Sequence, residues 1–243
     1  MNNGTINGKK ELNVRYYGTA DHLAGNLVLL GSVEASNLYK DKMYSAAEMT
    51  GIDIVYYTIL TNHVHKIIGA EEPDQVSEFY KRLNGSFSRS VKSLKKKDGT
   101  PLLMEGDKVF AGAPFLTPQY GPEQFLFTVC YQYHNSDGHD PFKFTNGEYK
   151  RSAAWEYERG IRTPENDTLL KMLGLTWQRL HDELLVLPAK ERAIRIREIA
   201  SCQDPEKMDK LFKLDPDKPF TAQLDHRLSK GSIVQLEDEW FEI

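Results

Sequence analysis

The sequence predicts an α+β fold in which helices flank an antiparallel sheet. Two observations lead to this expectation. Runs rich in β-branched and aromatic residues alternate with helix-like runs, in the order strand, helix, strand, strand, helix, helix. The 243-residue chain is also 40% hydrophobic and 27% charged, an ordinary globular composition that is sufficient to bury a core.

Apolar patterns and stop signals define the first elements. We expect a short strand over Asn26–Val33 and a helix over Glu34–Thr50, which ends at Gly51 because glycine readily adopts the conformation that terminates helices. Ile52–Leu60 is rich in β-branched and aromatic residues, which predicts a strand. Val64–Ile68 is either a further strand or the same strand after a kink.

Two longer helices follow. Apolar residues three and four positions apart predict a helix over residues 74–97, and the sequence DGTP at 98–101 indicates a turn. Residues 102–121 are rich in Gly and Pro, so we expect irregular structure or short strands there. Proline followed by glutamate favours a helix start at residue 122, which predicts a helix over 122–135 and a loop over 136–146.

The spacing of apolar residues along the sequence changes near residue 160. Beyond it, helical spacing predicts one helical stretch within Asp167–Leu185 and another over Lys190–Ala200. We therefore expect one domain over residues 1–160 and a helical C-terminal extension over 161–243. Its pattern suggests a helix-turn-helix, and packing or binding of a partner is the alternative role.

Composition excludes several classes of protein. No apolar run approaches the about 20 residues of a transmembrane helix, and residues 1–12 read as a polar, flexible tail without a signal core. We thus expect a cytoplasmic protein with no membrane partner.

Two distant cysteines, Cys130 and Cys202, form no zinc ribbon, which leaves histidine, carboxylate and amide groups as metal ligands. The net charge of −4 gives no global sign of nucleic-acid binding.

The charge distribution is more informative than its sum. Residues 79–97 hold seven basic residues and no acidic one. Within this run, Lys81, Arg82, Arg89 and Lys92 are candidate contacts to the phosphates of a polyanion. The alternative is that the run is only a solvated helix face.

Two histidines form the sharpest local feature. His63 and His65 flank Val64 at the end of a strand-like run. In a strand, residues two apart share a face, so the two imidazoles lie side by side while Val64 points into the core. Such a pair can bind a metal ion; two strand histidines without a ligand are the alternative.

A second candidate lies in the predicted helix 122–135. Tyr131 and Asn135 are four residues apart and share one helix face, whereas Tyr133 is about 200° away from Tyr131 around the axis. A hydroxyl and an amide oxygen that project together can supply a nucleophile and a metal ligand. A tyrosine with its ordinary pKa of about 10 needs help to attack a phosphate. The alternative is a core tyrosine and a helix-terminal asparagine.

Four motifs resemble those of one known family. They are TNHVHKII at 61–68, YKRLNGSFSR at 80–89, YQYHNS at 131–136 and YKRSAA at 149–154. In this order they resemble motifs of the single-tyrosine HUH transposases, in particular the REP-associated tyrosine transposases and their insertion-sequence relatives. The resemblance covers roughly residues 25–157.

The resemblance implies a mechanism and its residues. His63, His65 and Asn135 would bind Mg²⁺ or Mn²⁺, and Tyr131 would attack a phosphodiester of single-stranded DNA. The products would be a 5′-phosphotyrosine link and a free 3′-hydroxyl, which later reverses the step. The DNA would carry hairpins, and a homodimer is one expected assembly. Lys66 replaces a family leucine, and strand alternation predicts that it lies on the face opposite to His65.

Three function classes remain open at this point. The first is a transposase-like enzyme that cleaves and rejoins single-stranded DNA. The second is a non-catalytic or domesticated protein that binds single-stranded or hairpin DNA with the same fold. The third is a metallohydrolase that uses the histidine pair on a small substrate.

Overall fold

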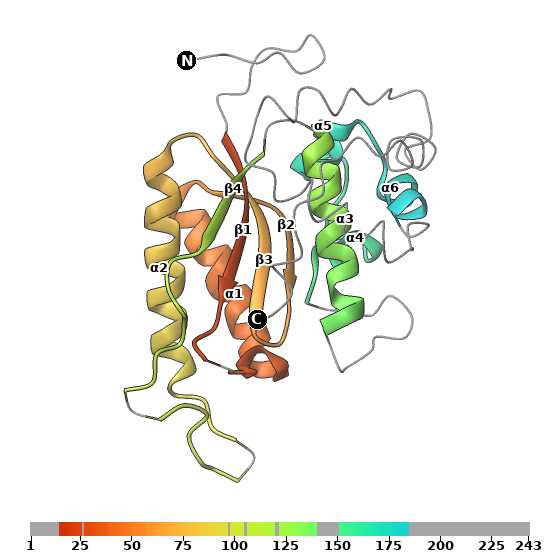
Figure 1. Cartoon of the computed structure of the whole chain (residues 1–243). Helices are drawn as coiled ribbons and strands as arrows, with labels where there is room; N and C mark the ends of the chain where they lie inside the picture. Colours follow the sequence, from red (N-terminus) through yellow and green to blue (C-terminus); the bar gives the residue numbers. More distant parts are fainter. Residues whose placement is uncertain are drawn as a thin grey trace, which may run out of the picture.

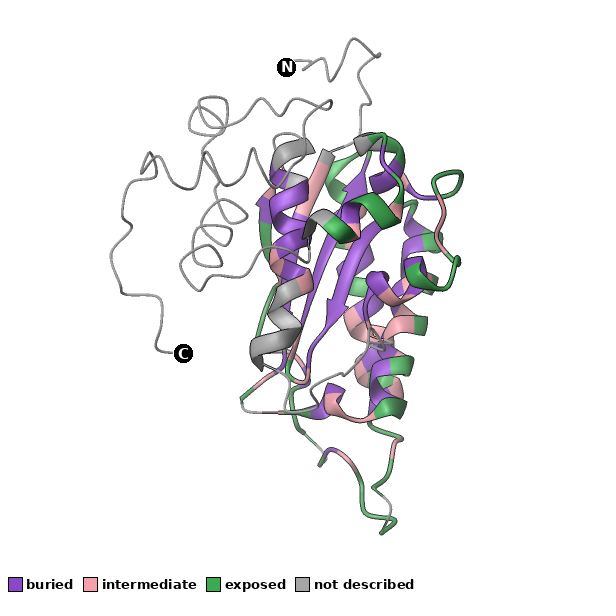
Figure 2. Ribbon diagram, turned by 90° about the vertical axis from the view of Figure 1, so that its right-hand side faces the viewer, coloured by how far each residue is buried: buried purple, intermediate pink, exposed green. Residues whose placement is uncertain are grey.

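The computed structural model describes residues 15–25, 27–96, 98–104, 106–119, 122–139 and 151–184. The expected tail 1–12, the loop beyond residue 139 and the expected helix over Lys190–Ala200 lie outside the described residues. In the described part, helices lie on both sides of one sheet, as the two orthogonal views show (Figures 1 and 2). No helix of this part combines the length and the apolar character needed to cross a membrane.

The sheet confirms the predicted fold class. Its strands are β1 (Arg15–His22), β2 (Asp53–Ile59), β3 (His63–Ala70) and β4 (Phe115–Pro118). They lie in the order β2-β3-β1-β4, and every neighbouring pair is antiparallel. β3 is thus a separate strand that returns beside β2, rather than a continuation of it.

The expected strand over Asn26–Val33 is wrong. Leu29–Gly31 instead forms a single 3₁₀ turn (η1), which buries Leu29 and Leu30 ahead of the first helix. The first strand is β1, whose polar and glycine-containing sequence RYYGTADH lacks the apolar alternation of a typical strand. Tyr80 and Lys66, which lie far along the chain, bond to Thr19 and Asp21 of this strand, and such long-range pairing leaves no local signal.

Helices α1 (Val33–Thr50) and α2 (Pro73–Val91) cover one face of the sheet, the α1/α2 face. The side chain of Ser32 caps the start of α1, and Gly51 ends it with a φ of 69°, as expected. A capping box starts α2. α2 ends at Val91, before the predicted residue 97, because the chain turns back into an isolated bridge between Lys95 and Pro101.

Helix α3 (Pro122–His139) covers the opposite face of the sheet, the α3 face (Figure 1). It starts where the sequence predicts and runs four residues past the predicted end. α3 lies close to β1 at Gly18, where a Cβ atom would be 3.0 Å from Nε2 of Gln119 and 3.5 Å from Cγ2 of Thr128. Gly18 pairs with Ile67 of β3, so α3 passes the sheet at this level.

The chain then folds around the outer edge of β2 through helices α4 (Ala153–Glu158), α5 (Thr168–Leu173) and α6 (Trp177–Leu184). The single helical stretch expected within Asp167–Leu185 is two helices, because Gly174 ends α5 in a left-handed conformation. Leucines of α5 and α6 join the same hydrophobic core as the sheet. The boundary expected near residue 160 remains a prediction.

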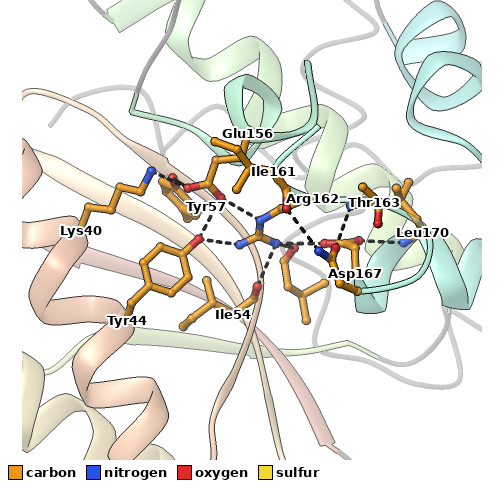
Figure 3. A network of polar contacts seen from close by, with 12 residues as sticks. Lys40, Tyr44, Ile54, Tyr57, Glu156, Ile161, Arg162, Thr163, Asp167 and Leu170 are labelled. Atoms are coloured by element: carbon orange, nitrogen blue, oxygen red, sulfur yellow. Dashed lines mark hydrogen bonds and ion pairs between the residues drawn. The ribbon is translucent and has the colours of Figure 1, made fainter. Parts of the chain in front are cut away.

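A network centred on Arg162 fastens this segment to the sheet (Figure 3). The guanidinium donates to the backbone carbonyls of Ile54 and Val55, at the irregularity of β2, and to carboxylates of Glu156 and Asp167. Glu156 also accepts from tyrosine hydroxyls of α1 and β2 and pairs with a lysine of α1. Four charged groups thus neutralise one another where the edge strand would otherwise expose unpaired carbonyls.

Candidate active site

The two candidate histidines lie on the α3 face of β3, side by side as predicted. Their ring centroids are 4.8 Å apart and the rings are nearly perpendicular, at 89°. His63 is half-buried at the start of the strand. His65 is only 9% exposed because α3 covers it, so this ring is less accessible than a histidine on an open sheet face.

The Tyr131 side chain reaches the same place from α3. Its ring centroid lies 5.3 Å from that of His65, with an interplanar angle of 77°. The Tyr133 ring lies instead 6.1 Å from that of His181 in α6. Residues two apart on a helix point in different directions, so only Tyr131 shares a site with the histidine pair.

The backbone of α3 carries Asn135 toward His63. The helix passes the level of Ile67 before it reaches His65, so it advances along β3 toward His63. Four residues of helix rise about 6 Å, and two residues of strand span about 7 Å. Asn135 therefore begins close to the level of His63, one turn after Tyr131. Its side chain lies outside the described residues, so its role as a ligand remains a prediction.

Asn62 orients the ring of His63. Its Oδ1 lies 2.7 Å from Nδ1 of His63. When Nδ1 carries the proton, it donates to this oxygen and leaves the lone pair of Nε2 for a metal ion. Sequence reasoning did not assign this role to Asn62, although its place directly before the histidine is a signal that could have suggested it.

A third histidine, His22, was not predicted as a site residue. It pairs with His63 across β1 and β3, and the two rings stack with centroids 5.1 Å apart and an interplanar angle of 16°. The cross-strand register brings it there, and β1 itself was not predicted. Stacked rings do not aim nitrogen atoms at one point. Among the described residues, no group of three His, Cys, Asp or Glu side chains is arranged to hold a metal ion.

The donor set that the resemblance implies nevertheless fits a divalent ion. His63 and His65 supply two imidazoles on one face, and Asn135 would supply an amide oxygen from the facing helix. Imidazole suits many divalent metals, whereas amide and carbonyl oxygens are suitable for Mg²⁺ and Mn²⁺. This set also leaves coordination positions for substrate and water.

Lys66 points to the α1/α2 face, as strand alternation predicts. Its side chain is fully buried, and Nζ lies 2.6 Å from Oδ2 of Asp21 and 2.9 Å from the hydroxyl of Tyr39. The Tyr39 hydroxyl also donates to Oδ2 of Asp21 at 2.5 Å. Burial lowers the pKa of Lys66, and Asp21 partly offsets this shift.

The structure does not bring the four candidate DNA-binding residues together with the histidine pair. Lys81, Arg82, Arg89 and Lys92 are exposed on α2 or directly after it, and α2 lies on the other side of the sheet. Lys81 and Arg82 both pair with Glu78, one turn earlier in the helix. Exposed pairs of this kind are weak, so both cations remain available to a phosphate.

The end of α2 lies at the same end of the sheet as His63. The ring of Phe87 is 5.9 Å from that of Phe110. The next residue, Ala111, donates its backbone N–H to the carbonyl of His22, which stacks on His63. The last cations of α2 are therefore reached from the histidine pair around the end of the sheet, rather than across it.

Comparison with known proteins finds no match by sequence and a weak likeness to two solved structures. No protein-family model and no curated protein matches the sequence. A solved structure of a REP-associated tyrosine transposase bound to a REP hairpin is 14% identical, with a TM-score of 0.47 over 60% of this chain and 79% of its own. A protein of Deinococcus radiodurans, described as a candidate transposase, is 17% identical, with a TM-score of 0.37 over 56% of this chain and 99% of its own.

Proposed function

We propose that the protein is a metal-dependent, transposase-like enzyme that cleaves and rejoins single-stranded DNA through Tyr131. One observation carries the proposal: the Tyr131 ring lies 5.3 Å from that of His65, which lies 4.8 Å from that of His63. The proposed nucleophile and the two proposed metal ligands thus lie on one face of the sheet, on two separate elements. The motif resemblance supplies the substrate class, single-stranded DNA with hairpins.

The chemistry is a transesterification. The Tyr131 hydroxyl oxygen forms a bond to phosphorus, the bond from phosphorus to the 3′-oxygen breaks, and the 3′-oxygen takes up a proton as the tyrosine loses one. A divalent ion, when bound, supplies Lewis-acid stabilisation of the charge that develops on the phosphate. His63 and His65, with Asn135, would hold that ion, and Asn62 orients the His63 ring. Since one phosphoester replaces another, the 3′-hydroxyl can reverse the step without a nucleotide cofactor.

Tyr131→Phe tests the proposal against a matched control, Tyr133→Phe. The full chain is incubated with labelled, hairpin-tailed single-stranded DNA and Mn²⁺. Wild type and Tyr133→Phe are expected to form a covalent adduct. Tyr131→Phe is expected to bind the DNA with similar affinity and to form no adduct, because only one oxygen atom is lost. Peptide mass spectrometry that finds the nucleotide on another residue would contradict the assignment.

A non-catalytic DNA-binding protein is the second candidate. The burial of His65 beneath α3 favours it, because a metal ion or phosphate needs access to this ring. The same experiment separates the two candidates. Binding of the hairpin DNA without any adduct, in the presence of Mg²⁺ or Mn²⁺, would support the second.

A further inference from the structure

An exposed aromatic side chain lies on the sheet face of the candidate site. Phe115 begins β4 and is 54% exposed. It is the one exposed Phe, Tyr or Trp whose side chain the structure describes. An exposed aromatic ring on an edge strand offers a flat surface on which another planar group can stack.

The register of the sheet places Phe115 in line with the histidine pair. Phe115 pairs with Ala20 of β1, and Ala20 pairs with His65 of β3. Residues directly opposite one another in antiparallel strands project from the same face. Phe115, Ala20 and His65 therefore form one row on the α3 face, in which only Phe115 is exposed and Ala20 and His65 are each 9% exposed. With strands about 4.8 Å apart, the row from His65 to Phe115 spans about 10 Å.

Neighbouring residues suit a negatively charged backbone. The segment that leads into β4 runs beside β1, where Ala111 bonds to His22 and Leu23 bridges to Phe110. Exposed lysines lie on the same extension between α2 and β4: Lys92, Lys95, Lys96 and Lys108. They outnumber its described acidic residues, Asp98 and Asp107. The described part of the extension that leads into β4 thus carries a net positive charge.

We infer that Phe115 is a base-stacking residue, which holds an unpaired base of the single strand next to the scissile phosphate. This inference rests on the proposed function, because it takes the substrate to be single-stranded DNA. Bases stack on aromatic rings whatever their sequence, since every base presents a flat π face. With a base on Phe115, the adjoining backbone would run along this row toward the partly exposed Tyr131 and His63. The row of side chains would then set which phosphodiester is cut.

Leu116 offers a matched control. It is the next residue on the same strand, is 37% exposed, and pairs with Thr19, whose side chain lies on the α1/α2 face. Phe115→Ala and Leu116→Ala therefore remove similar exposed apolar groups from opposite faces of β4. Phe115→Trp keeps a stacking surface at the same position.

The experiment measures binding of the full-length protein to hairpin-tailed single strands that carry 2-aminopurine at successive positions. Phe115→Ala is expected to bind on the order of 10- to 100-fold more weakly and to lose fluorescence quenching at one position near the cut. Leu116→Ala is expected to stay within about twofold of wild type, and Phe115→Trp to retain the quenching. Wild-type affinity and quenching in Phe115→Ala would overturn the inference.

The adduct assay keeps this result distinct from that of the proposed function. If wild type binds the DNA and shows stacking at Phe115 without forming an adduct, catalysis fails and the stacking role stands. If wild type forms the Tyr131 adduct and Phe115→Ala binds equally well, the stacking role fails and catalysis stands. Absence of any DNA binding by wild type overturns both.

Discussion

The two faces of β3 carry opposite kinds of chemistry. On the α1/α2 face, Lys66 is sealed from water and paired with Asp21. On the α3 face, His63 and Tyr131 remain partly accessible around the buried ring of His65. His65 and Lys66 are consecutive in one strand, yet His65 belongs to the candidate site and Lys66 to a buried ion pair. The difference shows that whether a polar residue of a strand has a structural or a functional role depends on what covers its face of the sheet.

This comparison gives each face a separate test. Substitutions on the α1/α2 face should change the free energy of unfolding. Substitutions on the α3 face should change the cleavage or binding of DNA while the fold stays stable. If a substitution on the α1/α2 face abolished cleavage without a loss of stability, the two faces would not have separate roles.

The largest effect on stability is expected from Asp21→Asn. This change leaves the buried charge of Lys66 without its counter-charge, which should cost about 3 kcal/mol of unfolding free energy. Urea denaturation measures the loss. The double variant Asp21→Asn with Lys66→Met should recover much of it, because an apolar side chain needs no counter-charge. Asp41→Asn, on the exposed side of α1, is the control and should change stability by less than about 0.5 kcal/mol.

The pH dependence of unfolding provides an independent check on Lys66. Burial lowers its pKa below the ordinary value of 10.5, so the unfolded chain binds this proton more tightly than the folded one. The contribution of Lys66 to stability therefore rises with pH in the window below 10.5. In Asp21→Asn the slope should be steeper between pH 7 and pH 9, because the offsetting carboxylate is gone. An unchanged slope would argue against a charged, buried Lys66.

A smaller effect on stability, with a complete loss of cleavage, is expected from His63→Ala. The ring is half-buried, so its removal should cost no more than about 1 kcal/mol. Loss of one protein ligand should abolish adduct formation at ordinary metal concentrations. His22→Ala is the control, since it removes an exposed ring that touches His63 but lies outside the expected ligand set. Full cleavage by His63→Ala would exclude the metal site.

The smallest effects are expected from the basic residues, and they concern only DNA binding. Arg89→Ala with Lys92→Ala should lower the slope of log affinity against log salt by about 1.4, which is about 0.7 for each lost phosphate contact. Lys81→Ala with Arg82→Ala should lower it less, because Glu78 pairs with both and they lie farther from the end of the sheet. Equal slopes for all variants would mean that α2 presents only a solvated face.

Local signals predicted the elements that carry the candidate site, and long-range pairing hid the rest. Helix α1 was predicted to within one residue because Gly51 stops it, and two-residue alternation correctly separated His65 from Lys66. Nothing near β1 in the sequence reveals that Asp21 pairs with Lys66 on the α1/α2 face. Nor does it reveal that His22 stacks on His63 on the α3 face. Both facts depend on strand register, which distant residues decide.

The Arg162 network has a consequence for assembly. An edge strand with free carbonyls can pair with a strand of another molecule, which leads to dimers through a continuous sheet or to aggregation. At β2 the guanidinium occupies the carbonyls of Ile54 and Val55, and the backbone of Arg151 bonds to Ile59. Growth of the sheet past β2 is therefore blocked. The expected homodimer, if it forms by strand pairing, must form elsewhere than at this edge.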